Sequence, residues 1–213
     1  IFNFMKNLSF KKKFKEKNKK WLRRQITDIY YIRSKKEGFR SRSSFKLIEL
    51  NNKFNFLQKK TKVLDLGAAP GGWAQVARKK CSEGKIMGID LLNIKELEGV
   101  FFLKCDLQKN DAIRSVEDYF QGKVDVLLSD MAPNTIGHAK ADHLRIINLV
   151  EVAIDLSNKV LKKEGIFICK IFQGGAQGEL QKKMKKNFYN LKYFKPKSSR
   201  PESSEAYLIA KKI

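Results

Sequence analysis

The sequence has few of the residues that build disulfide-rich or metal-binding proteins. It contains three cysteines and two histidines in 213 residues. Cys81, Cys105 and Cys169 are odd in number and widely spaced without a C-x-x-C pair, which argues against a disulfide framework and favours reduced thiols. His138 and His143 form H-x-x-x-x-H rather than the i, i+4 spacing of a helical zinc pair, and further ligands are missing. We therefore expect no metal site.

Long apolar runs are also missing. No apolar stretch approaches the roughly 18 residues that a membrane span requires. The first residues lack the charge, apolar run and cleavage site of a signal peptide, so we expect a soluble, cytoplasmic monomer without membrane contact. The alternative is an organellar matrix, because the amino end is basic and poor in acidic residues like a transit segment, although it is rich in Lys rather than in Arg and Ser.

Negative charge is the third shortage. The chain has 22 Asp and Glu residues against 45 Lys and Arg residues, a formal net charge of +23, which indicates a polyanionic partner such as nucleic acid. The alternative is a Lys-rich solvated surface, but the basic residues cluster, above all between Lys11 and Arg24. We expect residues 1–34 to form a flexible, basic RNA-binding arm, with Trp21, Tyr30 or Tyr31 able to stack on a base, and residues 35–213 to form one domain.

The most informative segment that is present is the run from Val63 to Trp73, VLDLGAAPGGW, in which an apolar strand breaks into a glycine turn that opens a helix. Gly67 allows a positive φ at the strand end, and Gly71 and Gly72 let a ligand approach the backbone. The spacing is not G-x-G-x-x-G, and the Lys and Ser/Thr of a P-loop are missing, so a pyrophosphate ligand is disfavoured. A ligand with a free ribose, such as S-adenosylmethionine, fits better; the alternative is a turn that merely reverses the chain.

Strand and helix patterns alternate along the chain, which indicates a mostly parallel sheet. The last two apolar runs are joined by a loop rich in Pro and Ser and should pair antiparallel. The expected fold class is therefore α/β: a Rossmann-like, methyltransferase-type fold with a mostly parallel seven-stranded sheet, an antiparallel carboxyl-terminal strand pair and helices on both faces. The expected strands are residues 63–66, 86–90, 100–104, 124–129, 166–172, 191–194 and 206–210. The expected helices are a short serine-capped helix that begins near Ser43, residues 74–80 and residues 144–161. In the last of these helices, one face carries Leu144, Ile147, Val150, Ile154 and Leu161.

Four acidic residues lie at strand ends: Asp65, Asp90, Asp106 and Asp130. In an open α/β sheet, ligands bind outside the carboxyl ends of the strands, so these carboxylates should face one crevice. Asp90 is placed to accept hydrogen bonds from ribose hydroxyls, and Asp106 could contact an adenine amino group. A single aspartate after a strand is more often a turn former or helix cap, but several in register favour ligand binding.

Lys170 lies inside an otherwise apolar strand, where burial of an ammonium group is costly. The alternative is a side chain that extends to solvent. A lysine whose charge is destabilised by desolvation or by a neighbouring cation can act as a base, and Asp130 on the adjacent strand could orient it.

These motifs together resemble the RrmJ/FtsJ (RlmE) family of ribosomal RNA 2′-O-methyltransferases. The resemblance runs from about Trp21 to the end of the chain and rests on GFRSRSSFK at residues 38–46, the Asp65–Trp73 turn, SDMAPN at 129–134, KIFQG at 170–174 and KPKSSR at 195–200. Gly174-Gly175-Ala176 departs from the family's Gly-Glu-Gly. The resemblance implies a catalytic tetrad of Lys46, Asp130, Lys170 and Glu205, and S-adenosylmethionine contacts at Gly71, Trp73, Asp90, Asp106 and Asp130, to which the turn adds Asp65, Gly67 and Gly72.

The resemblance further implies methylation of the ribose 2′-hydroxyl of a uridine in the A loop of 23S rRNA, within the 50S particle. Lys170 would be the base, or alternatively an electrostatic stabiliser of developing negative charge. Other functions that the residues permit are 2′-O-methylation of a tRNA anticodon loop and a purely RNA-binding role in ribosome assembly. The candidate phosphate contacts are Arg23, Arg24, Arg40, Arg42, Lys195, Lys197 and Arg200.

Overall fold

A computed structural model of the chain describes residues 28–107, 111–133, 139–172 and 177–213. The described residues form one seven-stranded sheet with the strand order β3-β2-β1-β4-β5-β7-β6. The strands are β1 Val63–Leu66, β2 Ile86–Asp90, β3 Phe101–Lys104, β4 Val124–Ser129, β5 Leu161–Phe172, β6 Phe188–Phe194 and β7 Glu205–Lys212. The helices are α2 Ile29–Lys36, α3 Ser44–Phe54, α4 Gly72–Lys80, α5 Asp111–Phe120, α6 Ala139–Val160 and α7 Gln177–Asn187.

The sheet is parallel from β3 to β5 and ends in an antiparallel pair. β1 pairs in parallel with β2 and β4, and β4 pairs in parallel with β5. β7 runs antiparallel to both β5 and β6. The expected fold class is confirmed, including the antiparallel carboxyl-terminal pair. This order leaves the carboxyl ends of β1, β2 and β4 side by side at one edge, where a ligand site of an α/β sheet is expected.

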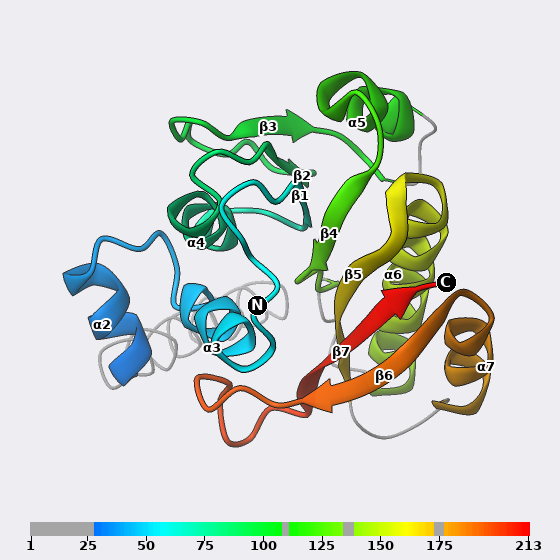
Figure 1. Cartoon of the computed structure of the whole chain (residues 1–213). Coiled ribbons are helices and arrows are strands. Elements are labelled where there is room, and N and C mark those ends of the chain that lie inside the picture. Colours follow the sequence, from blue (N-terminus) through cyan, green and yellow to red (C-terminus); the bar gives the residue numbers. More distant parts are fainter. Residues whose placement is uncertain (1–27, 108–110, 134–138, 173–176) are drawn as a thin grey trace, which may run out of the picture.

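Helices cover both faces of the sheet (Figure 1). α3 and α4 pack on one face, in a cluster that includes Leu47, Trp73 and Tyr207. α5, α6 and α7 pack on the other, in a cluster that includes Val150 and Met184. The central parallel strands β1, β2 and β4 are thus buried on both faces, which is what parallel strands require.

The apolar face of α6 differs in part from the expected one. Leu144 is 66% exposed, and Leu161 belongs to β5 rather than to the helix. Val150 and Ile154 are buried as expected, and Ile146, one turn before Val150, is buried with them in the same core cluster. The expectation was therefore right in the middle of the helix and wrong at both of its ends.

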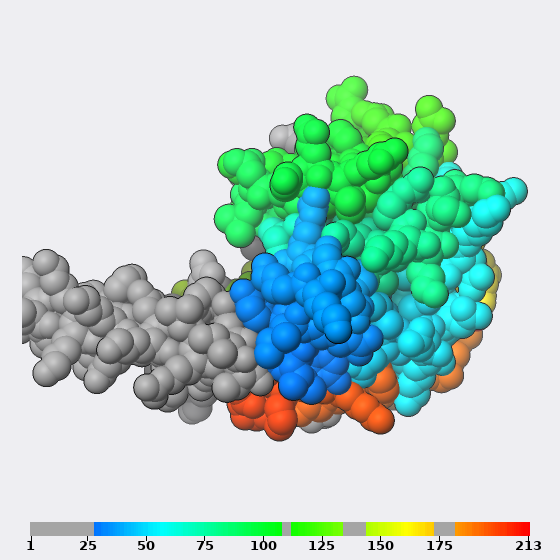
Figure 2. Space-filling view, turned by 90° about the vertical axis from the view of Figure 1, so that its left-hand side faces the viewer, coloured from blue at the N-terminus to red at the C-terminus, as the bar shows by residue number. Residues whose placement is uncertain are grey.

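α2 was not expected, because residues 29–34 were assigned to the basic arm. Asp28 explains the helix: its Oδ1 accepts hydrogen bonds from the backbone N–H groups of Tyr30 and Tyr31, both at 3.1 Å. The Tyr30 ring lies 5.5 Å from that of Phe45 on α3, so this aromatic residue packs within the domain. Figure 2 shows α2, in blue, on the surface above the orange segment that precedes β7. Trp21 and the rest of the arm lie outside the described residues.

Candidate active site at the carboxyl ends of the strands

The turn between β1 and α4 needs its glycines because other parts of the chain press against it. Gly67 has φ +72°, and a Cβ there would lie 2.8 Å from Met131 Cγ. Gly71 has φ +100°, and its Cβ would lie 2.7 Å from Arg40 Nη1. A Cβ on Gly72 would collide with Ser41 Oγ. At Gly71 and Gly72, therefore, the segment 40–44 also approaches closely, and contact of a ligand with these glycines stays a prediction.

A cavity of about 530 Å³, called here the larger cavity, opens beside this turn. Its volume lies within the range typical of small-molecule sites. Three of the four expected carboxylates line it, together with apolar side chains from three strand ends. The lining includes Gly67, Ala69, Asp90, Leu91, Leu92, Asp106, Asp130 and Met131. The Asp90 carboxylate accepts backbone N–H bonds from Ala69 and Leu92, each at 2.9 Å, and so joins the turn to the loop after β2.

Two expected cofactor residues, Asp65 and Trp73, are buried and do not line the larger cavity. Asp65 is fully buried, and neither carboxylate oxygen has a hydrogen-bond partner among the described residues. Burial, followed by the negative charges of Asp130 and Asp90, raises the pKa of Asp65 well above its usual value. Trp73 is 2% exposed, and its indole N–H donates to the Ser43 carbonyl at 2.8 Å. Both side chains are buried in the protein beside the glycine turn. A direct contact of either with the cofactor stays a prediction.

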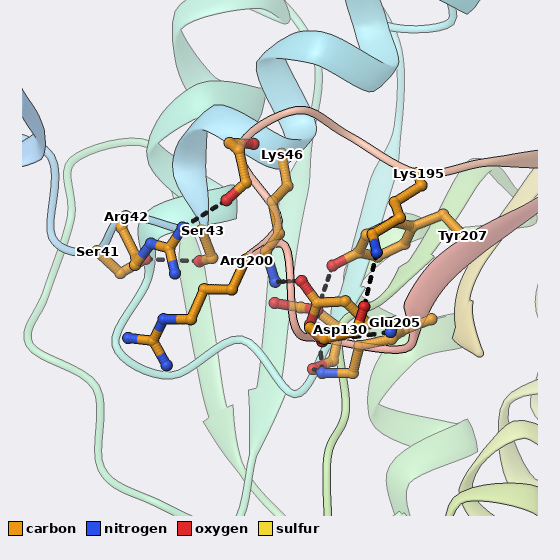
Figure 3. A network of polar contacts seen from close by, with 12 residues as sticks. Ser41, Arg42, Ser43, Lys46, Asp130, Lys195, Arg200, Glu205 and Tyr207 are labelled. Carbon is orange, nitrogen blue, oxygen red and sulfur yellow. Dashed lines mark hydrogen bonds and ion pairs between the residues drawn. The ribbon is translucent and has the colours of Figure 1, made fainter. Parts of the chain in front are cut away.

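The four tetrad residues form two ion pairs, and Figure 3 labels three of them, Lys46, Glu205 and Asp130. Lys170 Nζ lies 3.1 Å from Asp130 Oδ1 and donates to the Asp130 carbonyl at 2.7 Å. Lys46 Nζ lies 2.5 Å from Glu205 Oε1. Both lysines are buried, at 8% exposure for Lys46 and 7% for Lys170, although a lone buried ammonium would be unstable. The two carboxylates compensate these charges, so α3, β4, β5 and β7 together supply a paired cluster from their ends and adjoining residues.

Tyr207 joins this cluster and was not found from the sequence. Its O–H donates to Asp130 Oδ1 at 2.7 Å, and its ring lies 5.5 Å from Trp73. Burial would raise the pKa of Asp130, but the nearby ammonium groups of Lys170 and Lys46 and the Tyr207 hydrogen bond lower it overall. A signal was available: Tyr207 is two residues from Glu205 on one strand and therefore on the same face of the sheet.

A second cavity, of about 330 Å³ and called here the smaller cavity, is lined by two side chains of the tetrad, Lys46 and Glu205. Its lining is polar and mostly charged: Arg42, Lys46, Arg200, Glu202, Ser203 and Glu205. Asp130 lines the larger cavity, whereas Lys46 and Glu205 line the smaller one. The charged cluster thus lies between two cavities of different character.

The residues expected to bind phosphate are placed in different ways. Arg42 and Arg200 line the smaller cavity, and both approach Asp28 Oδ2, at 3.1 Å and 3.6 Å. The Lys195 ammonium donates to the Ser203 carbonyl at 2.7 Å, whereas Lys197 is exposed. Arg40 is engaged with backbone carbonyls, as described below. Arg23 and Arg24 lie outside the described residues.

Cysteine and metal chemistry gain no support from the described residues. Cys81 and Cys169 are buried, and burial raises the pKa of their thiols to about 11 and about 12, so both are protonated at neutral pH and unreactive. In the described part of the chain, no group of three or more His, Cys, Asp or Glu residues is placed to hold a metal ion. Within the same ranges, no helix is long and apolar enough to cross a bilayer.

The chain is similar in sequence and in structure to proteins named as ribosomal RNA methyltransferases. Ribosomal RNA large subunit methyltransferase E from Novosphingobium aromaticivorans is 48% identical over 191 residues, covering 90% of this chain and 86% of the relative. The protein of the same name from Rickettsia bellii is 48% identical over 196 residues, covering 89% and 86%. A crystal structure from Plasmodium falciparum, assigned as a ribosomal RNA methyltransferase, superimposes with a TM-score of 0.74 at 30% identity and covers 82% of this chain and 98% of that one. The model of the FtsJ-like methyltransferases matches residues 39–213, and the chain belongs to that family.

Proposed function

We propose that this protein transfers a methyl group from S-adenosylmethionine to a ribose 2′-hydroxyl of large-subunit ribosomal RNA. The observation that carries the proposal is the position of the tetrad between the two cavities. A methyl donor and an acceptor must meet within bonding distance, and two cavities that share one charged boundary provide that arrangement. The relatives are named as methyltransferases of large-subunit ribosomal RNA, which is the substrate class proposed for this chain.

The larger cavity fits S-adenosylmethionine. The carboxylates of Asp90 and Asp106 provide acceptors for ribose hydroxyls and an adenine amino group, and each oxygen of Asp90 keeps a lone pair beyond its backbone bond. Leu91, Leu92 and Met131 provide apolar surface for a purine ring. When bound, this cofactor supplies an electrophilic methyl group. Asp130 adds negative charge at the boundary where its sulfonium would lie.

Lys170 is the proposed base. A ribose 2′-hydroxyl becomes a good nucleophile only as its proton leaves. Once Lys170 has released one ammonium proton to solvent, its neutral amine accepts the hydroxyl proton on Nζ while its two remaining N–H groups stay bonded to Asp130. The Lys46–Glu205 pair lies where the acceptor would enter and positions the hydroxyl by charge-assisted hydrogen bonds. Arg42 and Arg200 in the smaller cavity neutralise phosphates on either side of the target ribose.

The specific target that we propose is a uridine in the A loop of 23S rRNA within the 50S particle, modified by a monomeric enzyme. The test uses labelled S-adenosylmethionine with undermethylated 50S subunits and, separately, with unmodified tRNA. We expect label in 50S subunits at a 2′-O-methyl uridine of the A loop and none in tRNA. Label only in the tRNA anticodon loop would replace the proposed substrate by tRNA, and RNA binding without transfer to either would leave a binding factor.

A further inference from the structure

Arg40 uses its guanidinium group on the backbone of its own chain. Nη1 donates to the carbonyls of Pro70 at 3.3 Å and Lys95 at 2.5 Å, and Nη2 donates to the carbonyl of Glu96 at 2.6 Å. A planar fork of fixed donors can satisfy several carbonyls at once, which a lysine ammonium at the end of a flexible chain cannot reproduce. The expectation that Arg40 binds an RNA phosphate therefore conflicts with how its donors are used.

The carbonyls that Arg40 binds belong to the two segments that wall the larger cavity. Pro70 ends the glycine turn, whose Gly67 and Ala69 line the cavity, and residues 95 and 96 belong to the loop after β2, whose first residues also line it. Asp90 joins the same two segments by accepting N–H bonds from Ala69 and Leu92. The Asp90 carboxylate and the Arg40 guanidinium thus each form hydrogen bonds to both the glycine turn and the loop after β2.

Arg40 is itself held in place by α4. Its backbone N–H donates to Gln75 Oε1 at 2.6 Å, and Gln75 Nε2 donates to the carbonyl of Gly38 at 3.1 Å. Gly71 has no side chain, and a Cβ there would collide with Nη1. The positive φ of Gly71 and its missing side chain therefore make room for the guanidinium. Hydrogen bonds within the protein therefore hold both the backbone and the guanidinium group of Arg40.

We propose that Arg40 is a positioning residue of the cofactor site, which sets the separation of the glycine turn and the loop after β2, and that it does not bind an RNA phosphate. This inference rests on the proposed function only in taking the larger cavity as the site of S-adenosylmethionine. It assigns different tasks to neighbouring arginines of one segment: Arg40 shapes the larger cavity, and Arg42 lines the smaller one.

The test measures cofactor binding without catalysis. Calorimetric titration of the full chain with S-adenosylhomocysteine compares the wild type, Arg40→Lys and Arg40→Ala. We expect Kd to rise roughly tenfold for both variants, the size of effect produced by losing about 1.4 kcal/mol of binding free energy. Arg78→Lys is the matched control, because Arg78 Nη1 also donates to backbone carbonyls, those of Cys81 and Gly84 at the far end of α4. Its Kd should equal that of the wild type even if its melting temperature falls as far as that of Arg40→Lys.

RNA binding separates the two roles of Arg40. If Arg40 bound a phosphate, Arg40→Ala would make the negative slope of log K for RNA binding against log salt less steep by about 0.7 to 0.9. Replacing a positioning residue leaves that slope unchanged. Unchanged affinity for S-adenosylhomocysteine in Arg40→Lys overturns the inference. Should Arg40→Ala fail to fold, Arg40→Lys keeps the charge and most of the aliphatic stem and decides the question. A wild type that does not bind S-adenosylhomocysteine would instead refute the proposed cofactor site.

Discussion

Asp65 is a buried carboxyl group on β1, directly before the glycine turn, and its environment predicts that the stability of the fold falls as the pH rises. Burial, then Asp130 and Asp90, raises its pKa in the folded chain well above the value of 3.8. The folded state therefore holds this proton more tightly than the unfolded state does. The stabilising contribution is complete below the unfolded pKa and is lost as the pH rises through the folded pKa.

The change that tests this is Asp65→Asn, which cannot ionise. We expect the melting temperature of the wild type to fall relative to that of Asp65→Asn as the pH is raised from about 4, measured by thermal unfolding in a series of buffers. Asp118→Asn, at an exposed position, is the control and should show no such trend. Parallel curves for the wild type and Asp65→Asn would mean that Asp65 is not a buried protonated group.

Tyr207→Phe isolates the hydrogen bond to Asp130. Burial, then the charges of Asp130 and Glu205, raises the pKa of Tyr207 well above 10, so the phenol keeps its proton and donates it to the carboxylate. Phenylalanine keeps the ring contact with Trp73 and removes only the donor. We expect a loss of about 1 to 2 kcal/mol in the free energy of unfolding by urea titration, and a fall in transfer rate much smaller than that caused by removing Lys170. An unchanged stability would show that this hydrogen bond contributes nothing.

At the level of single residues, the sequence predicted the partner of a buried charge better than it predicted how side chains from distant segments pack together. A lysine in an apolar strand required a partner, and Asp130 was identified as that partner before the fold was known. The pairing of Lys46 with Glu205 could not be predicted from the residues alone, because it depends on how α3 packs against the start of β7. A side chain at Gly71 or Gly72 would meet Arg40, Ser41 or Ser44, a packing constraint that the sequence did not reveal, and the approach of a ligand to these glycines stays a prediction.

At the level of elements, the expected strands with continuous apolar runs and turn residues at both ends agree with the structure. β1, β2 and β4 have the expected bounds. α7 was missed because QGELQKKMKKN has few apolar residues, one of which, Met184, is fully buried. α2 was missed because its start depends on the Asp28 cap and its packing on a distant aromatic residue, Phe45. These two helices have weak local patterns and depend on tertiary contacts. α5 was also missed, although Ala112, Val116 and Phe120 recur at helical spacing and are buried.

The loop from 195 to 203 is fastened to α3 by Glu49, whose carboxylate accepts the backbone N–H groups of Lys197 at 2.6 Å and Ser198 at 2.9 Å. This loop carries Arg200 and Ser203 of the smaller cavity. We expect Glu49→Ala to raise the KM for RNA several-fold and to leave the Kd for S-adenosylhomocysteine unchanged, because hydrogen bonds to a charged group are worth about 1.5 to 3 kcal/mol each and only the smaller cavity depends on them.

Hydrogen exchange of the same loop provides the direct measurement for Glu49→Ala. The amides of Lys197 and Ser198 should lose protection in this variant. Glu83→Ala is the control, because Glu83 forms an exposed pair with Lys59 on another part of the surface. Equal protection in Glu49→Ala and the wild type would contradict the role given to Glu49.

At the scale of the whole molecule, the net charge of +23 predicts RNA affinity that falls steeply with salt. Replacing Lys11, Lys12 and Lys13 with Gln should reduce the slope of log K against log salt by up to about 2, if most of these residues meet phosphates. The affinity for S-adenosylhomocysteine should not change, because the larger cavity is lined by residues of the domain. A slope equal to that of the wild type would assign these lysines to a solvated surface.

Lys170 is the residue on which the proposed mechanism depends, and it pairs with Asp130, which lines the larger cavity. The most direct test is a single-turnover measurement of methyl transfer from labelled S-adenosylmethionine to undermethylated 50S subunits by the wild type and by Lys170→Ala, with binding of cofactor and RNA measured separately. We expect both ligands to bind Lys170→Ala with near wild-type affinity while the transfer rate falls by at least about 10²-fold, the lower range for loss of a general base. Transfer by Lys170→Ala at a rate near that of the wild type would contradict the mechanism.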